Sequence, residues 1–166
     1  IERADALILP GVGAFPDAME HLRARGLDAV IRNQAGRKPL LGICLGMQLL
    51  FEAGDEIRPC DGLGLIPGRV GKIETKRKLP HIGWNNLEFP NPSPLFAGLE
   101  KGAYVYFVHT YCGRPSRPED VLAHTDYGEK ICAAVGRGGV YGCQFHPEKS
   151  GEAGLLILKN FGELSR

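Results

Sequence analysis

The sequence lacks the features that would tie it to a membrane or a nucleic acid. Its apolar runs are short: residues 6–9 and 155–158 are among the longest, far below the roughly 20 residues that a membrane-spanning helix needs. Lys and Arg number 20 and Asp and Glu number 19, so the formal net charge is only +1. No excess of one charge attracts nucleic acid or an anionic membrane. We therefore expect neither among its partners.

Closely spaced cysteines are missing as well. The five cysteines are Cys44, Cys60, Cys112, Cys132 and Cys143, and no two of them form a Cys-x-x-Cys pair. This spacing excludes a zinc ribbon and a thioredoxin-type redox motif. An odd number of widely spaced cysteines is typical of a reducing, cytoplasmic setting.

What is present indicates one folded domain. The 166 residues are 43% hydrophobic and 23% charged, which are ordinary values for a globular domain. We expect residues 1–166 to form a single domain, and the 23 glycines and 12 prolines to make many tight turns.

The hydrophobic pattern predicts an α/β domain. Strands are expected at residues 6–9, 40–43, 69–74, 84–89, 103–110, 121–125, 131–135 and 140–145. Helices are expected at residues 18–25, with Asp17 as the N-cap, and at 27–34, 47–53 and 152–164. Strands 69–74 and 84–89 are candidates for a hairpin, and residues 55–68 and 90–102 are expected to be loop. Together these elements indicate a sheet with an antiparallel addition.

The strongest chemical signal is a cysteine between two glycines. Residues 42–46 read Gly-Ile-Cys-Leu-Gly, between a predicted strand and a predicted helix. This is the nucleophile-elbow pattern with sulfur in place of oxygen. The turn exposes Cys44 at a helix N-terminus, where the helix dipole favours a thiolate. The backbone N–H of Leu45 is then expected to face the oxygen of a substrate bound to the sulfur.

A base for this cysteine is expected from the segment that follows strand 140–145. His146 lies at the carboxyl end of that strand, where open α/β sheets place their sites. It could take the Cys44 proton and later give it to a leaving amine. Glu148, two residues further on, could hold the imidazole. His109 also ends a predicted strand and is the rival base, but no carboxylate follows it two residues later.

A glycine-rich turn after the first strand could complete an oxyanion hole. Residues 10–15 read Pro-Gly-Val-Gly-Ala-Phe, and the N–H groups around Gly11 and Val12 could act together with that of Leu45. A plain tight turn is the alternative interpretation. A phosphate-binding loop is excluded because the rest of that motif is absent.

These segments together resemble the class I (triad) glutamine amidotransferase family. The resemblance rests on residues 42–48 (Gly-Ile-Cys-Leu-Gly-Met-Gln) and 145–148 (Phe-His-Pro-Glu). Residues 9–15, 79–85, 106–111 and 146–150 resemble, more narrowly, the glutaminase subunits of imidazole glycerol phosphate synthases. The resemblance implies a three-layer sandwich with a mostly parallel central sheet. It also implies that an N-terminal β-α-β portion is absent here, so an N-terminally truncated domain is expected.

The resemblance further implies hydrolysis of L-glutamine to glutamate and ammonia, with Cys44, His146 and Glu148 as the catalytic residues. Gln48 and Glu56 match positions that bind the amino-acid end of glutamine, and backbone groups near Thr110 and Tyr111 would hold its carboxylate. No metal or organic cofactor is implied.

A partner is implied as well. In the family a separate (β/α)₈-barrel cyclase subunit uses the ammonia to make imidazole glycerol phosphate and an aminoimidazole carboxamide ribotide in histidine biosynthesis. A heterodimer is therefore expected, docked through the face around residues 11–15, Trp84 and Lys149. Three alternatives stay open: another class I amidotransferase, a stand-alone γ-glutamyl hydrolase or cysteine peptidase, and an inactive truncated docking module.

Overall fold

The central sheet of the chain has five strands in the order β1-β2-β11-β10-β9. The computed structural model describes residues 1–165. The strands are β1 (Leu7–Gly11), β2 (Leu40–Cys44), β11 (Val140–Cys143), β10 (Lys130–Arg137) and β9 (Val121–Asp126). The first three run parallel, β10 pairs antiparallel with β11, and β9 pairs antiparallel with β10. All five residues of β2 are buried, as expected of a strand that is covered on both faces.

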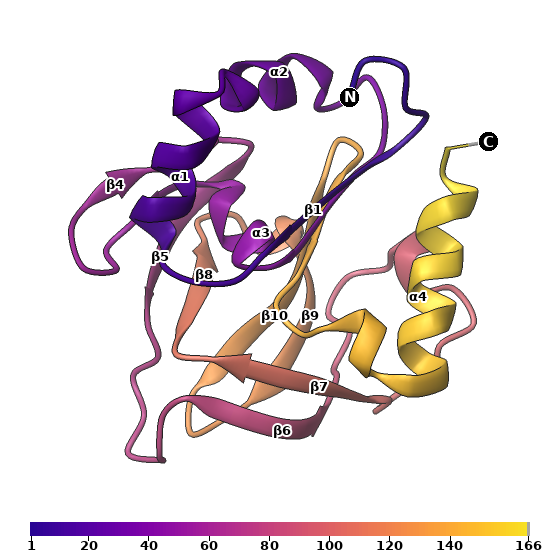
Figure 1. Cartoon of the computed structure of the whole chain (residues 1–166). Coiled ribbons are helices and arrows are strands. Elements are labelled where there is room, and N and C mark those ends of the chain that lie inside the picture. The colour runs from indigo at the N-terminus through magenta and orange to yellow at the C-terminus, as the bar shows by residue number, and fades with distance from the viewer. Residues whose placement is uncertain (166) are drawn as a thin grey trace.

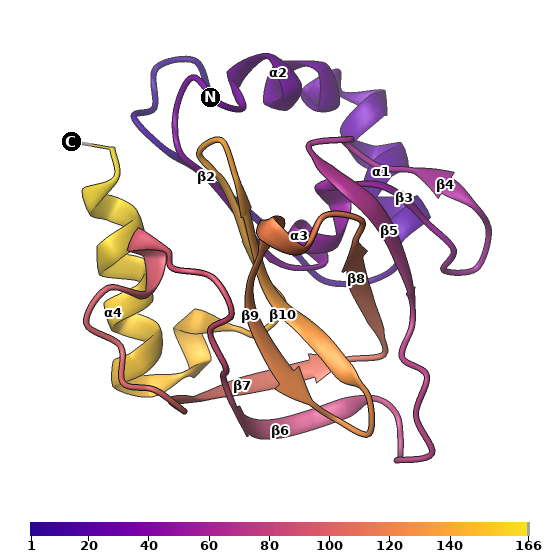
Figure 2. The ribbon, with the colours of Figure 1, turned by 180° about the vertical axis from the view of Figure 1, so that it is seen from behind.

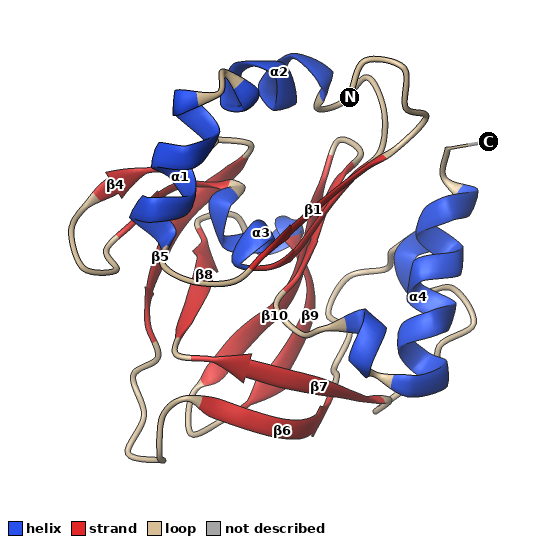
Figure 3. Ribbon diagram, in the orientation of Figure 1, coloured by secondary structure: helices blue, strands red, loops and turns tan. Residues whose placement is uncertain are grey.

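Six further strands form two smaller sheets. A mixed sheet has the order β4-β3-β5-β8, made by β4 (Cys60–Asp61), β3 (Phe51–Gly54), β5 (Ile66–Lys72) and β8 (Tyr111–Pro115). An antiparallel pair joins β6 (His81–Asn86) to β7 (Tyr104–His109). Figure 3 shows this pair running across the lower part of the molecule, with β9 and β10 passing behind it in that view.

Helices lie on both sides of the central sheet (Figures 1 and 2). On one side are α1 (Phe15–Ala24), α2 (Leu27–Gln34) and the short α3 (Leu45–Leu49); on the other is α4 (Gly151–Glu163). Three 3₁₀ turns complete the described elements: η1 (Pro94–Phe96), η2 (Pro118–Asp120) and η3 (Pro147–Lys149).

The side chains of β2 divide the core into two clusters. Leu40 packs with Phe15, Met19 and other residues on the α1 side. Leu41 and Ile43 belong to a second cluster that includes residues of α4. This alternation follows from the two-residue period of a strand, and it gives the sheet a covering layer on each side.

Several predicted elements are confirmed. The helix at 27–34 has the predicted bounds, and the terminal helix is one residue off at each end. Strands 6–9, 40–43, 121–125 and 131–135 are all present with small shifts. Strand 140–145 ends two residues early, and strand 103–110 is β7, followed after one residue by β8.

Other predictions are wrong. The helix expected at 47–53 already ends at Leu49, because Phe51–Gly54 leaves it to pair with β5. Strands 69–74 and 84–89 do not form a hairpin, since β5 pairs with β3 and β8 while β6 pairs with β7. Asp17 is not an N-cap, because α1 begins two residues before it. The loop expected at 55–68 contains β4 and the first residues of β5.

Candidate active site

Cys44 lies at the tip of a sharp turn between β2 and α3. Its backbone has φ 54° and ψ −114°, a positive φ that is strained for a residue with a side chain. A Cβ atom on Gly42 would lie 2.6 Å from the carbonyl oxygen of Gly46, and one on Gly46 would overlap the carbonyl of Leu9. Both glycines are therefore required by close backbone contacts, as the nucleophile-elbow prediction demands.

This geometry predicts a large loss of stability for Gly46→Ala. The added methyl would force the elbow away from β1, so we expect the free energy of unfolding to fall by about 3 kcal/mol or more. Thermal or urea unfolding measures this change. Gly162→Ala is the matched control, because a Cβ at Gly162 meets nothing within 4 Å. An equal effect of the two substitutions would contradict the role of Gly46.

The thiol of Cys44 is more buried than the sequence suggests. Burial raises the pKa of Cys44, while the Leu45 backbone N–H and the charge of Lys149 lower it by less. The Leu45 N–H at the start of α3 favours the thiolate, as expected of a helix N-terminus, but burial outweighs it, so the pKa of Cys44 is raised. The α3 helix has only five residues, and desolvation of the sulfur outweighs its dipole. A base that takes the thiol proton is all the more necessary.

His146 has the geometry of such a base. Its Nδ1 lies 2.7 Å from Oε1 of Glu148, so Nδ1 carries the proton and its N–H donates a hydrogen bond to the carboxylate. In the neutral ring Nε2 is then an acceptor. This Nε2 is buried and has no hydrogen-bond partner among the described residues, and the ring lines the same pocket as Cys44. The structure therefore places a free lone pair in the pocket that holds the thiol.

The backbone of His146 is fixed by β7. The His146 N–H donates to the carbonyl of Tyr106, 2.9 Å away. The hydroxyl of Ser150 donates to the His146 carbonyl at 2.6 Å and accepts from the Tyr106 N–H at 3.0 Å. Ser150 is almost fully buried. A shift of β7 would therefore also move the imidazole.

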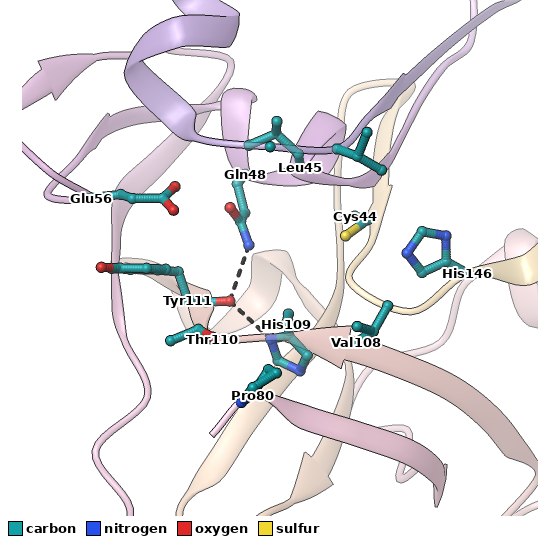
Figure 4. A pocket seen from close by; sticks show the side chains of 12 residues that line it. Cys44, Leu45, Gln48, Glu56, Pro80, Val108, His109, Thr110, Tyr111 and His146 are labelled. Atoms are coloured by element: carbon teal, nitrogen blue, oxygen red, sulfur yellow. Dashed lines mark hydrogen bonds between the residues drawn. The ribbon is translucent and has the colours of Figure 1, made fainter. Parts of the chain in front are cut away.

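A pocket of about 310 Å³ opens beside Cys44 (Figure 4). This is a size suited to a ligand as small as one amino acid. Its lining residues are Val12, Gly13, Cys44, Leu45, Gln48, Glu56, Pro80, Val108, His109, Thr110, Tyr111 and His146. Figure 4 shows the sulfur and the imidazole on one side of it, with the carboxylate of Glu56 on the other.

All four residues expected to bind glutamine lie in this pocket. Gln48 is buried, and its Nε2 donates to the Tyr111 carbonyl at 3.0 Å. Oε2 of Glu56 accepts from the Phe15 N–H at 2.8 Å. Thr110 and Tyr111 line the opposite wall. The structure therefore brings together groups that are 63 residues apart in sequence.

The glycine-rich turn also reaches the site. Gly11 is in register with Cys44 across β1 and β2, and a Cβ atom on Gly11 would lie 3.2 Å from Cβ of Leu45 and 3.3 Å from the backbone nitrogen of Gly46. Val12 and Gly13 line the pocket, and the φ of Gly13 is +100°. The turn, rather than Gly11 itself, forms the rim of the pocket.

His109 is not available as the rival base. Its Nδ1 lies 2.8 Å from the Tyr111 carbonyl, and its Nε2 lies 3.0 Å from Nδ1 of His81. Burial lowers the pKa of His109 to about 4. Both ring nitrogens already have partners, so His146 is the histidine with a free nitrogen at the pocket.

One face of the β6–β7 pair is apolar and exposed. Ile82 and Trp84 are opposite Val108 and Tyr106 in the register; we call these four residues, together with Tyr104, the hairpin face. Trp84 is 55% and Tyr104 61% exposed. Val108 also lines the pocket, so the hairpin face borders the candidate active site.

Lys149, which directly follows Glu148, is exposed, whereas Phe15, which was also predicted to lie on the docking face, is fully buried. The docking face predicted around residues 11–15 therefore does not include the side chain of Phe15.

Sequence reasoning missed some residues of the site. Pro80 and Val108 line the pocket, and the side chain of Gln144 reaches Cys44. Gln144 lies two residues before His146, so the period of the strand could have placed both on one side. Pro80 directly precedes β6, and Val108 lies on β7. Nothing in the nearby sequence indicates that these two strands pair with each other at the site.

Comparisons with known proteins show what the chain is similar to. A family model for glutamine amidotransferase class-I matches residues 2–163. Imidazole glycerol phosphate synthase subunit HisH of Bacillus cereus (strain G9842) is 51% identical over 163 residues, which cover 97% of this chain and 77% of that protein. The HisH subunit of Moorella thermoacetica is 50% identical and is covered to 80%.

Solved structures support the fold alone. A crystal structure of a glutamine amidotransferase superposes with a TM-score of 0.74 at 24% identity and covers 99% of this chain and 80% of that one. A glutamine amidotransferase from Thermotoga maritima gives a TM-score of 0.69 at 17% identity over 98% of this chain and 64% of that one. The predicted α/β fold class is thus confirmed. No helix within residues 1–165 is long and apolar enough to cross a membrane.

Proposed function

The chain belongs to the class-I glutamine amidotransferase family, and from this premise we propose that Cys44, His146 and Glu148 hydrolyse glutamine in its pocket. One observation carries the assignment of residues. The imidazole of His146 is held on one nitrogen by Glu148 and offers its other, unpartnered nitrogen to the pocket that contains the Cys44 thiol. This is the arrangement of a nucleophile, a base and an orienting carboxylate.

In the first half of the reaction Nε2 of His146 takes the thiol proton, and the sulfur attacks the side-chain amide carbon of glutamine. A C–S bond forms, and the amide oxygen becomes an oxyanion. The imidazolium then gives its proton to the amide nitrogen, the C–N bond breaks and ammonia leaves. Cys44 is left as a γ-glutamyl thioester.

In the second half a water molecule gives a proton to His146 and attacks the thioester. The C–S bond breaks, glutamate leaves, and the proton returns to the sulfur. The backbone N–H groups of Leu45 and of the turn at Gly11 and Val12 stabilise the oxyanion in both halves. Glu56 and the free Oε1 of Gln48 accept from the α-ammonium group of glutamine, while backbone N–H groups near Thr110 and Tyr111 hold its α-carboxylate.

The relatives at about 50% identity are named as subunits of imidazole glycerol phosphate synthase. We extend their role to this chain: it supplies ammonia to a cyclase subunit of (β/α)₈-barrel fold in histidine biosynthesis, within a heterodimer. The hairpin face and Lys149 form the docking surface, because they border the pocket from which ammonia must leave. A reducing, cytoplasmic setting suits a reaction that depends on a free thiol at Cys44.

The docking proposal predicts a specific defect for Trp84→Ala. Removal of a half-exposed indole from the centre of an interface is expected to weaken cyclase binding by about 2 kcal/mol, or roughly 30-fold. Isothermal titration calorimetry measures the affinity, and a glutamate-release assay with and without the cyclase measures its stimulation. Leu155→Ala is the control, since Leu155 is an exposed apolar side chain on α4 and is not part of the hairpin face. Unchanged affinity for Trp84→Ala, or full glutamine turnover without the cyclase, would contradict this coupling.

A further inference from the structure

A fully buried side chain contacts the candidate nucleophile from inside the protein. Gln144 has no exposed surface, and its Nε2 lies 3.9 Å from Sγ of Cys44. Gln144 is not among the residues that line the pocket. It therefore reaches the sulfur from the core, while a substrate would reach it from the pocket.

The orientation of the Gln144 amide is determined by its neighbours. The carbonyl of Tyr111 can only accept, so the end of Gln48 that lies 3.0 Å from it must be the NH₂ group. The same nitrogen of Gln48 lies 3.0 Å from Gln144. Since an NH₂ group can only donate, the Gln144 atom that faces it is the oxygen. The NH₂ group of Gln144 must then face the sulfur.

The Tyr111 carbonyl is itself held by a pair of histidines. Nδ1 of His109 donates to it at 2.8 Å. With Nδ1 protonated, the neutral ring accepts at Nε2 from Nδ1 of His81, 3.0 Å away. Burial lowers the pKa of both rings to about 4, so both stay neutral near pH 7. The donor and the acceptor are therefore fixed in each hydrogen bond of the chain that runs from His81 on β6 to Cys44 at the elbow.

From this chain of contacts we infer that Gln144 is a further catalytic residue, whose amide N–H stabilises the Cys44 thiolate, and that Gln48, His109 and His81 are positioning residues that keep the amide in this orientation. A hydrogen bond to a charged atom is stronger than one to a neutral atom. Gln144 therefore favours the thiolate over the thiol and offsets part of the desolvation of the sulfur. The donor needs no movement when the proton passes to His146.

This inference deepens the proposed function, but its main test does not depend on glutamine turnover. The rate at which iodoacetamide alkylates Cys44, followed by peptide mass spectrometry as a function of pH, reports the ionisation of the thiol. Gln144→Met keeps a side chain of similar length and removes the donor. We expect the midpoint of the Cys44 profile to rise by about one pH unit, with alkylation about tenfold slower below the midpoint. His146, Glu148 and Lys149, which face Cys44, are unchanged in this variant.

The matched control removes a different buried amide. Nδ2 of Asn160, on α4, donates to the carbonyls of Leu95 and Ala97. Asn160→Leu is expected to lower the stability but to leave the Cys44 midpoint where it is. A midpoint that is unchanged in Gln144→Met, or moves equally in both variants, would overturn the inference. A shifted midpoint in a chain without glutaminase activity would leave the inference intact and refute the proposed function instead.

A measurement on the unmodified chain covers the case in which Gln144→Met fails to fold. The sequence has three glutamines, Gln34, Gln48 and Gln144, so side-chain ¹⁵N labelling of glutamine gives three NH₂ resonance pairs. The pair of Gln144 is expected to shift with the same midpoint as Cys44 alkylation, and that of Gln34 on α2 to stay fixed. A Gln144 pair that stays fixed while Cys44 ionises would overturn the inference.

Discussion

Replacement of Cys44 by serine is expected to lower glutamine hydrolysis by about 10⁴-fold or more. A serine hydroxyl is far less acidic than a thiol and is a much weaker nucleophile with the same base. The pocket does not otherwise change, so the dissociation constant for glutamine should stay within about threefold of its original value. Glutamate release measures the first quantity, and calorimetry the second.

Cys60→Ser is the control for this experiment, because Cys60 is partly exposed on β4 and does not line the pocket that contains Cys44. It should retain full activity. The Cys44→Ser chain should also still support the cyclase when ammonia is added, since only the supply of ammonia is lost. Substantial glutamine turnover by Cys44→Ser would show that another group is the nucleophile.

The second large loss of activity is expected when His146, the proposed base, is replaced. His146→Ala removes the proton acceptor, and we expect kcat to fall by about 10³-fold. Glu148→Gln should cost less, about 10- to 100-fold. The side chain of Glu148 is 47% exposed, so the glutamine amide can turn its oxygen toward Nδ1 and keep part of the orientation. Steady-state kinetics of both variants at several glutamine concentrations separates kcat from KM.

Equal losses in kcat for the two variants would indicate that Glu148 does more than orient the ring. An increase in KM for Glu148→Gln, with kcat unchanged, would instead make it a substrate-binding residue. Glu152→Gln serves as the control, since Glu152 is an exposed carboxylate in the first turn of α4.

The sequence predicted the elbow because its causes are local. Gly42, Cys44 and Gly46 form a strand-turn-helix within five residues, and the close contacts of both glycines follow from that turn. The order and spacing of His146 and Glu148 were equally local, and the structure joins them at 2.7 Å. The roles of Gln48 and Glu56 came only from the family resemblance, since each looks ordinary in its own segment.

Long-range pairing explains what the sequence could not predict. Phe51–Gly54 has a helical neighbourhood in sequence, but its pairing with β5 outweighs the local preference. The hairpin of β6 and β7 joins segments separated by 17 residues, so nothing nearby in sequence indicates it. The contact between Gln144 and Cys44 spans 100 residues, and the histidine pair depends on the same hairpin.

The net rise in the pKa of Cys44 could not be predicted from the sequence for a related reason. A helix start can be read from sequence, but the degree to which the surrounding chain removes water from the sulfur cannot. In the structure desolvation is the largest influence on the Cys44 pKa and raises it. The site therefore depends on His146 for activation, and on the donors around the sulfur for stabilising its charge.

The central claim, that Cys44 is the nucleophile of a glutaminase, is tested most directly by covalent trapping. The chain is treated with a glutamine analogue that carries an electrophile in place of the side-chain amide, and the modified cysteine is identified by peptide mapping. Burial raises the pKa of Cys112 to about 11 and also raises those of Cys132 and Cys143, while Cys60 is partly exposed and tests for non-specific labelling. We expect one label per chain, on Cys44, prevented by excess glutamine and absent in His146→Ala at short times. A label on Cys60 with Cys44 free, or labelling of Cys44 that glutamine does not prevent, would show that Cys44 is not the nucleophile of a glutaminase.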